Sequence, residues 1–268
     1  MNAALAEAAI AGGRPVAAEA VLDARGLSFA HAGAGTVFDG ISLSIRRREI
    51  VALLGSSGCG KSTLLRVLAG LETPATGEVC FLGQPQAEPH PRSALVFQQP
   101  SLLPWLKLAD NVGFGLNFAH QPRAGKAALA ARVAAAIEAV GLAGREGAYP
   151  AQLSGGMAQR AALARALARE PELLFADEPF SALDAITRAE MQALLVDVVH
   201  RWHSAVLLVT HDIDEAILVA DRIVLMGGRP GHLVQEWSVD IPRDREDHPD
   251  AVAALRLAIL AALRHASP

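Results

Sequence analysis

The hydrophobic pattern of the first hundred residues predicts short strands and one helix. Residues 41–45 (ISLSI) alternate apolar and polar side chains with a period of two, as a half-buried strand does. Residues 49–54 (EIVALL) contain a continuous apolar run, which is typical of a strand covered on both faces. A glycine-rich segment and the helical pattern of residues 62–71 follow at once, and Gly70 lies where such a helix would end. A strand, a glycine-rich loop and a helix in this order form half of a parallel α/β unit.

The pattern changes after two more expected strands, at residues 78–82 and 94–97. Residues 107–148 contain an alanine-rich helical pattern over residues 127–142 and no strong strand pattern, so we interpret them as a helical insertion in an α/β domain. Helices and strands then alternate again. The expected helices are residues 157–169, 188–200 and 213–220, and the expected strands are residues 172–176, 205–210 and 222–226.

The two ends of the chain differ from this central part. Residues 1–20 are rich in alanine and contain a Gly-Gly-Arg-Pro break, so we expect a mobile tail. Residues 243–250 (RDREDHPD) are mostly charged and are expected to form a solvated linker. A helical pattern follows from about Asp250 to His265, and its leucine and alanine spacing favours packing on the core over a regulatory role.

Composition argues against a chain that crosses a membrane. Although 51% of the 268 residues are apolar, the longest run without a charged residue, 93–106, has only 14 residues, and a spanning helix needs about 20. The first residues lack a basic segment before an apolar one, and Cys59 and Cys80 are the only cysteines, which favours a reducing, cytosolic setting. The net charge of -4 argues against nucleic acid as the main partner.

Residues 55–63 (GSSGCGKST) match the phosphate-binding loop pattern, in which small residues let backbone N–H groups surround phosphate oxygens. Lys61 would reach the β- and γ-phosphates, and the Ser62 hydroxyl would bind Mg²⁺. An ordinary glycine-rich turn is the alternative, and the preceding strand and following helix disfavour it. The expected ATP contacts are Gly55, Ser56, Ser57, Gly58, Cys59, Gly60, Lys61, Ser62 and Thr63.

Asp177 and Glu178 directly follow the apolar run of residues 173–176. Ligands of open α/β sheets bind at the carboxyl ends of the strands, so both acids would face the phosphate loop. Asp177 would hold the Mg²⁺, and Glu178 could polarise the attacking water. Two adjacent acids are often only a solvated strand end, but a phosphate loop upstream requires such a carboxylate.

Residues 153–160 (LSGGMAQR) resemble the signature sequence of ATP-binding cassette (ABC) ATPases, and the resemblance extends from about residue 21 to residue 242. It implies an α/β P-loop NTPase (RecA-like) core with an antiparallel β subdomain and a helical signature subdomain at about residues 100–160, followed by a linker and helix at residues 243–268. In this family the signature binds the γ-phosphate of the opposite subunit in a head-to-tail dimer. The partner's Ser154, Gly155 and Gly156 would therefore complete each site when ATP forms the homodimer.

Three further motifs are similar to those of ABC ATPases. Gln98 resembles the glutamine that senses Mg²⁺ and the attacking water, although the adjacent Gln99 is not excluded. Residues 181–184 (SALD) resemble the loop that crosses the dimer interface, and His211 resembles the histidine that contacts the γ-phosphate. The sequence departs from the family at His31, where an aromatic residue usually stacks on adenine; Phe29 is the other candidate, with core packing as its expected role.

Residues 102–112 and 222–233 resemble the branch of ABC importers for nitrate, aliphatic sulfonates and taurine. The resemblance implies a peripheral ATPase on the cytoplasmic face of the inner membrane that drives two integral-membrane permease subunits, with a periplasmic or lipid-anchored solute-binding protein as indirect partner. Leu103, Trp105 and Leu106 would dock on the permease, or else pack in the insertion. The alternatives are a soluble ABC ATPase acting on nucleic acid or ribosomes, and a small-molecule kinase that would leave residues 153–160 without a role.

Overall fold

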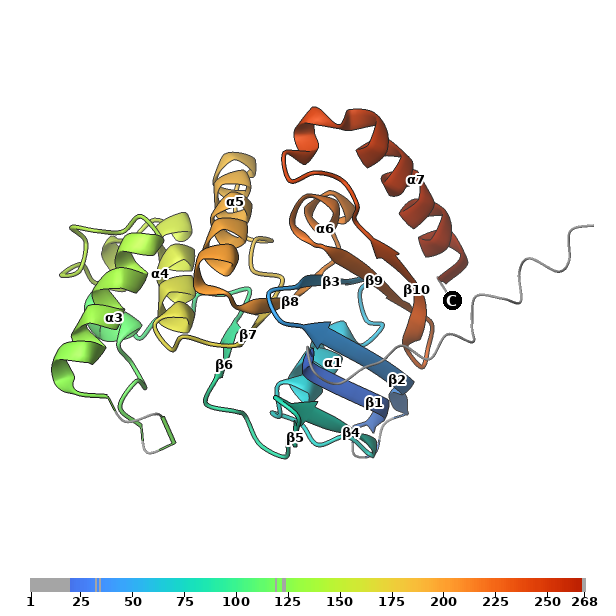
Figure 1. The fold of residues 1–268 in the computed structure, drawn as a ribbon, viewed down its shortest axis with the longest axis horizontal. Helices are drawn as coiled ribbons and strands as arrows, with labels where there is room; N and C mark the ends of the chain where they lie inside the picture. The colour runs from blue at the N-terminus through green and yellow to red at the C-terminus, as the bar shows by residue number, and fades with distance from the viewer. Residues whose placement is uncertain (1–19, 32, 34, 119, 122–123, 267–268) are drawn as a thin grey trace, which may run out of the picture.

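Two β-sheets with helices around them form the fold in the computed structural model (Figure 1), which describes residues 20–31, 33, 35–118, 120–121 and 124–266. The smaller sheet is antiparallel and has the strand order β2-β1-β4-β5. Its strands are β1 (Ala20–Ala30), β2 (Thr36–Arg46), β4 (Thr76–Phe81) and β5 (Gln84–Pro85). The expected mobile tail, residues 1–20, lies outside the described residues except for Ala20, which begins β1.

The larger sheet has the order β10-β9-β3-β8-β7-β6, in which β9, β3, β8, β7 and β6 are parallel and β10 is antiparallel to β9. Its strands are β3 (Ile50–Gly55), β6 (Ser93–Val96), β7 (Leu173–Asp177), β8 (Ala205–Thr210), β9 (Arg222–Gly227) and β10 (His232–Ser238). Every residue of β3 is buried, as its apolar run predicts, because Ile50 and Leu54 face one core cluster whereas Val51 and Leu53 face the other.

The helices divide between these two clusters. Helix α1 (Lys61–Leu68) packs in the cluster that contains the inner face of the antiparallel sheet, and it ends just before Gly70 as expected. The opposite face of the large sheet is covered by α4 (Gly155–Leu167), α5 (Ala185–Trp202), α6 (Ile213–Val219) and α7 (Pro249–Ala266). Within the described part of the chain, no helix has the length and apolar character needed to cross a bilayer.

A helical insertion follows β6 and projects from the sheet at the left of Figure 1. It contains α2 (Leu108–Val112), α3 (Lys126–Ala139), the 3₁₀ turn η1 (Pro150–Gln152) and α4. Leu108, Val112 and Ile137 are buried against α4, which returns the chain to the sheet. The predicted α/β class, with its parallel sheet and antiparallel sheet, is therefore confirmed.

The structure adds two details to the expected element pattern. Strand β10 was not expected, because most of its residues are exposed and lack an apolar run. The expected solvated linker, residues 243–250, is mostly exposed, but it contains a 3₁₀ turn, η2 (Arg245–Asp247), whose Arg245 is only 2% exposed. The guanidinium groups of Arg243 and Arg245 donate to the carbonyl oxygens of Val219 and Ile217, at 2.9 and 2.5 Å, and thus cap the carboxyl end of α6.

Candidate functional site

The predicted phosphate loop connects the end of β3 with the start of α1. A Cβ atom on Gly55 would lie 2.2 Å from the carbonyl oxygen of Met226 on β9, so only glycine fits at this position. Residues 56–60 follow, and the loop opens on the amino end of α1, where backbone N–H groups and the helix dipole favour phosphate. Ser56, Ser57 and Gly58 are exposed, whereas Gly60, Ser62 and Thr63 are half-buried.

Lys61 is buried within this loop. Its Nζ donates hydrogen bonds to the carbonyl oxygens of Gly55 and Ser56, at 2.8 and 3.0 Å. The ammonium group is thus held where phosphate oxygens would need a positive charge. The buried thiol of Cys59 lies 3.6 Å from the carbonyl oxygen of Met226, so this side chain fixes the loop to β9.

Ser62 and Asp177 meet at the carboxyl ends of β3 and β7. The Ser62 hydroxyl donates to Oδ1 of Asp177 at 2.9 Å. Burial raises the pKa of Asp177, and the hydrogen bond from Ser62 acts in the opposite direction. The described residues contain no group of three His, Cys, Asp or Glu side chains that could hold a metal alone. A hydroxyl and one carboxylate nevertheless suit Mg²⁺, which takes its other ligands from phosphates and water.

Glu178 and His211 extend from the ends of β7 and β8. Oε1 of Glu178 lies 3.3 Å from Nδ1 of His211. Glu178 has a left-handed backbone (φ 45°), and its N–H donates to the carbonyl oxygen of Val209 at 3.0 Å. Its own carbonyl oxygen accepts hydrogen bonds from the N–H and hydroxyl of Ser181, at 3.3 and 2.9 Å. The turn between strand and SALD segment therefore aims Glu178 at His211.

Gln98 follows β6 and is exposed, as is the neighbouring Gln99. In the described part of the chain, no hydrogen bond connects Gln98 with Ser62 or Asp177. The segment is instead fixed by α4, in two contacts that the sequence analysis missed. The buried Gln159 donates to the carbonyl oxygen of Phe97 at 3.2 Å. Arg165 donates to the carbonyl oxygens of Pro100 and Ser101, at 2.9 and 2.8 Å.

The segment that resembles the signature begins α4. Ser154 caps the helix, since its hydroxyl accepts the N–H of Met157 at 3.3 Å. A Cβ on Gly156 would lie 2.5 Å from Cγ2 of Thr187, so glycine allows α4 to approach the start of α5. Ser154 and Gly155 are exposed, and among the described residues no hydrogen bond or ion pair connects Ser154 with residues 55–63. The exposed helix end is available to an anion outside this subunit's own loop.

Phe29 and His31 lie at the end of β1 in different surroundings. Phe29 is 6% exposed and stacks on Phe38, with ring centroids 5.9 Å apart. His31 is exposed, and its ring meets the edge of Phe29 at 5.1 Å. Val37, which follows on β2, lies against Gly60 of the phosphate loop. His31 is therefore the accessible ring on this side of the loop, and Phe29 supports it from the core.

Glu215, a buried acid on α6, was not among the expected site residues. The Thr210 hydroxyl forms a hydrogen bond with this carboxyl group and accepts the N–H of Asp212 at 3.0 Å. Burial raises the pKa of Glu215 to about 7, with Asp212 and Glu178 acting in the same direction and Thr210 and Arg188 opposing it. The available sequence signal for a residue near the site was its position, four residues after His211 in the first turn of the helix that follows β8.

Comparisons with known proteins agree with this geometry. The ABC transporter family model matches residues 38–181. The chain is 48% identical over 232 residues to the aliphatic sulfonates import ATP-binding protein SsuB 2 of Burkholderia lata, covering 87% of this chain and 82% of the relative. It is 51% identical over 231 residues to SsuB 2 of Nocardia farcinica, covering 86% of this chain and 90% of that protein.

Two solved structures have the same fold. One is cbiO1 of Clostridium perfringens, described as part of the ABC transporter complex cbiONQ; it is 25% identical, has a TM-score of 0.76, and the match covers 92% of this chain and 100% of that one. The other is the ATP-binding cassette MJ0796, a dimer in a post-hydrolysis state with ADP and Pi. It is 28% identical, has a TM-score of 0.70, and the match covers 81% of this chain and 98% of that one.

Proposed function

The chain belongs to the ABC transporter family, and from this premise we propose that it is the ATP-hydrolysing subunit of a bacterial importer for aliphatic sulfonates. Relatives named for aliphatic sulfonate import support this substrate class over nitrate or taurine. The solute would be selected by other subunits, because the candidate site has the chemistry of a nucleotide site.

One observation carries the proposal: the groups needed for ATP hydrolysis meet at one edge of the parallel sheet. Lys61 and Ser62 come from the loop after β3, Asp177 and Glu178 from the end of β7, and His211 from the end of β8. The 2.9 Å contact of Ser62 with Asp177 and the 3.3 Å contact of Glu178 with His211 link these segments. This edge is where α/β sheets bind nucleotides.

Each residue has a role in the proposed reaction. Lys61 would exchange its two carbonyl partners for the β- and γ-phosphate oxygens of ATP. Ser62, Asp177 and Gln98 would hold Mg²⁺, which neutralises phosphate charge. Glu178 would accept the proton of the attacking water, and His211 would hold the γ-phosphate while its other nitrogen faces Glu178.

Assembly completes the proposed site. Two copies would form a head-to-tail homodimer on ATP binding, each supplying its exposed Ser154 and Gly155 and its half-buried Gly156 to the other's γ-phosphate. The dimeric cassette of similar fold supports this arrangement. The homodimer would dock on two permease subunits at the cytoplasmic face of the inner membrane. A periplasmic or lipid-anchored solute-binding protein would deliver the sulfonate.

Growth of a deletion strain tests the function. A strain that lacks this gene is expected to grow on sulfate but not on an alkanesulfonate as sole sulfur source. The unaltered gene and its Lys126→Ala variant, which changes an exposed lysine on α3, should restore growth. Lys61→Ala should not, because the phosphate loop loses its charge. If the deletion strain grew normally on alkanesulfonates but failed to grow on nitrate or taurine, the transported solute would be nitrate or taurine instead.

A further inference from the structure

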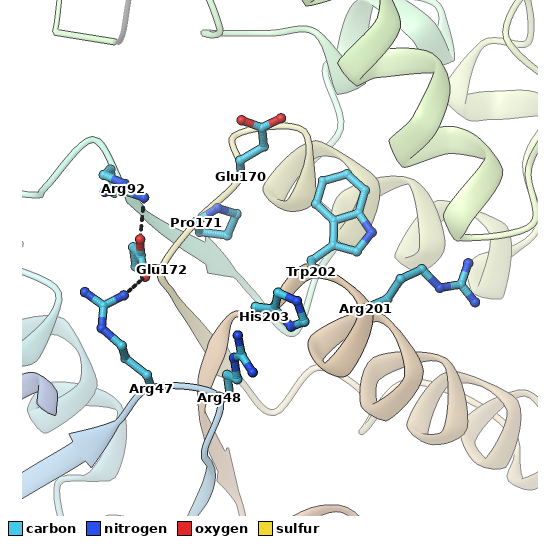
Figure 2. A pocket seen from close by; sticks show the side chains of 9 residues that line it. All are labelled: Arg47, Arg48, Arg92, Glu170, Pro171, Glu172, Arg201, Trp202 and His203. Atoms are coloured by element: carbon cyan, nitrogen blue, oxygen red, sulfur yellow. Dashed lines mark hydrogen bonds and ion pairs between the residues drawn. The ribbon is translucent and has the colours of Figure 1, made fainter. Parts of the chain in front are cut away.

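A cavity of about 550 Å³ lies at the edge of the large sheet where the parallel strands begin (Figure 2). It is formed by four segments that precede β3, β6, β7 and β8. The lining residues are Arg47, Arg48, Arg92, Glu170, Pro171, Glu172, Arg201, Trp202 and His203. None of them has a role in the proposed ATP site.

The charges around this cavity are unbalanced, with four guanidinium groups and two carboxylates. Glu172 is shared, because it forms ion pairs with both Arg47 and Arg92, as Figure 2 shows. Arg201 pairs with Asp197 at 2.6 Å, and Glu170 pairs with Arg132 at 2.9 Å.

Arg48 differs from the other three arginines. No hydrogen bond or ion pair joins its side chain to any residue that the structure describes. The lining therefore has an excess of two positive charges, one on the Arg47–Glu172–Arg92 cluster and one on Arg48. Such a surface favours a ligand with two negative charges.

Three residues around the cavity have a left-handed backbone. Arg48, Glu170 and His203 have φ values of 60°, 51° and 56°, in the left-handed region that side chains rarely adopt. They are three of six such non-glycine residues in the described chain, and Glu178 of the proposed catalytic site is another. His203 is the C-cap of α5 and Glu170 follows the end of α4, so two of the three end helices, and the left-handed turns fix the lining segments at these ends.

We propose that this cavity binds a compact dianion, with the oxyanion chemistry shared by inorganic phosphate, sulfate and a phosphomonoester. Arg48 is the direct contact, the Arg47–Glu172–Arg92 cluster supplies the second charge, and Pro171 and Trp202 form an apolar wall. The observations that support this site do not rest on the proposed importer function.

The position of the cavity connects it with ATP hydrolysis. The strands that begin at its wall, β3, β6, β7 and β8, end at the phosphate loop, Gln98, Asp177 and His211. Their starts are already linked, since the N–H of Glu172 donates to the carbonyl oxygen of Arg92 and the N–H of Ala205 donates to that of Glu172, both at 2.8 Å. A dianion bound here would brace the four strands from the end opposite the nucleotide.

Calorimetric titration with sulfate, inorganic phosphate and glycerol 3-phosphate tests the proposal. The full chain is used, both unaltered and with Lys61→Ala to disable the phosphate loop as a competing anion site. Sulfate is expected to bind one site that survives Lys61→Ala and weakens about tenfold on Arg48→Gln, since a charged hydrogen bond is lost. Arg145→Gln removes an exposed charge on the helical insertion and is the matched control.

Glu172→Gln should have the opposite effect to Arg48→Gln. The affinity for sulfate should rise about tenfold, because Arg47 and Arg92 lose the carboxylate they share. This variant keeps the test decisive if Arg48→Gln fails to fold. Tighter binding of glycerol 3-phosphate than of phosphate would identify an ester as the ligand, and equal binding would identify the free ion. The proposal fails if no probe binds the Lys61→Ala chain, if Arg145→Gln weakens binding as much as Arg48→Gln, or if Glu172→Gln weakens it.

Discussion

Oε1 of Glu178 and Nδ1 of His211 lie 3.3 Å apart, although 33 positions separate the two residues in the chain. The contact exists because β7 and β8 are parallel neighbours, with Asp177 opposite Val209, so that both chains leave the sheet at the same edge. It gives the imidazole one fixed neighbour and leaves the second ring nitrogen for a ligand.

Glu178→Gln is expected to lower ATP hydrolysis by on the order of 10²- to 10⁴-fold, because an amide cannot accept the proton of the attacking water. ATP binding should persist, since Lys61 and the phosphate loop are unchanged, and the ATP-bound variant should accumulate as a dimer. Phosphate release, nucleotide affinity and size-exclusion chromatography measure these effects. Glu138→Gln, an exposed change on α3, is the control. Undiminished hydrolysis in the Glu178 variant would falsify the proposed role of Glu178.

The strand, phosphate loop and helix at residues 50–68 could be predicted because their signals are local. An apolar run, small residues and a periodic helix follow one another, and each element forms within its own segment. The acids after β7 and His211 after β8 were also predictable, because parallel strands deliver their carboxyl ends to one edge.

The missed features depend on contacts between distant segments. Gln159 lies 62 positions from the carbonyl oxygen of Phe97 that it binds, and Arg245 lies 28 positions from that of Ile217. A charged or amide side chain is ordinarily expected in solvent, and only the folded chain supplies the carbonyl groups that allow its burial. Strand β10 was missed for a different reason. It lies at the edge of the sheet, most of its residues are exposed, and it therefore lacks an apolar run.

His31→Ala should weaken ATP affinity about two- to tenfold, because stacking of an aromatic ring contributes about 0.5–1.5 kcal/mol. Phe29→Ala should act differently, since Phe29 is 6% exposed and stacks on Phe38. A large-to-small change in the core costs about 3–5 kcal/mol of unfolding free energy. Nucleotide titrations and urea denaturation separate the two effects. Unchanged ATP affinity in the His31 variant would remove this residue from the site.

Trp105→Ala is expected to preserve ATP hydrolysis by the isolated chain and to abolish most permease-coupled transport. Trp105 is 70% exposed in the loop between β6 and α2, and a large aromatic residue at the centre of an interface often contributes about 2 kcal/mol or more. Leu257→Ala is the control, because Leu257 is equally apolar and 66% exposed but lies on α7. Normal transport by the Trp105 variant would show that the permease docks elsewhere.

Glu215 should make the folded chain less stable as pH rises from about 4.5 to about 7. Burial raises its pKa from 4.5 to about 7, so the folded chain holds a proton that the unfolded chain has released over this range. The unfolding free energy therefore falls with pH through the window and is constant above it. The pKa shift of Glu215 corresponds to a loss of unfolding free energy on the order of 3 kcal/mol at pH 8.

Replacing Glu215 with glutamine tests this dependence. Gln is neutral at every pH and can still accept the hydroxyl hydrogen bond of Thr210, so Glu215→Gln should be more stable than the unaltered chain at pH 8 and nearly equal to it below pH 5. Asp212, Glu178 and Arg188 surround the carboxyl group and are kept in both chains. Urea denaturation between pH 4.5 and 8 measures the difference, with Glu72→Gln as an exposed control that removes the same charge. A difference between Glu215→Gln and the unaltered chain that stays constant with pH would mean that Glu215 does not titrate in this window.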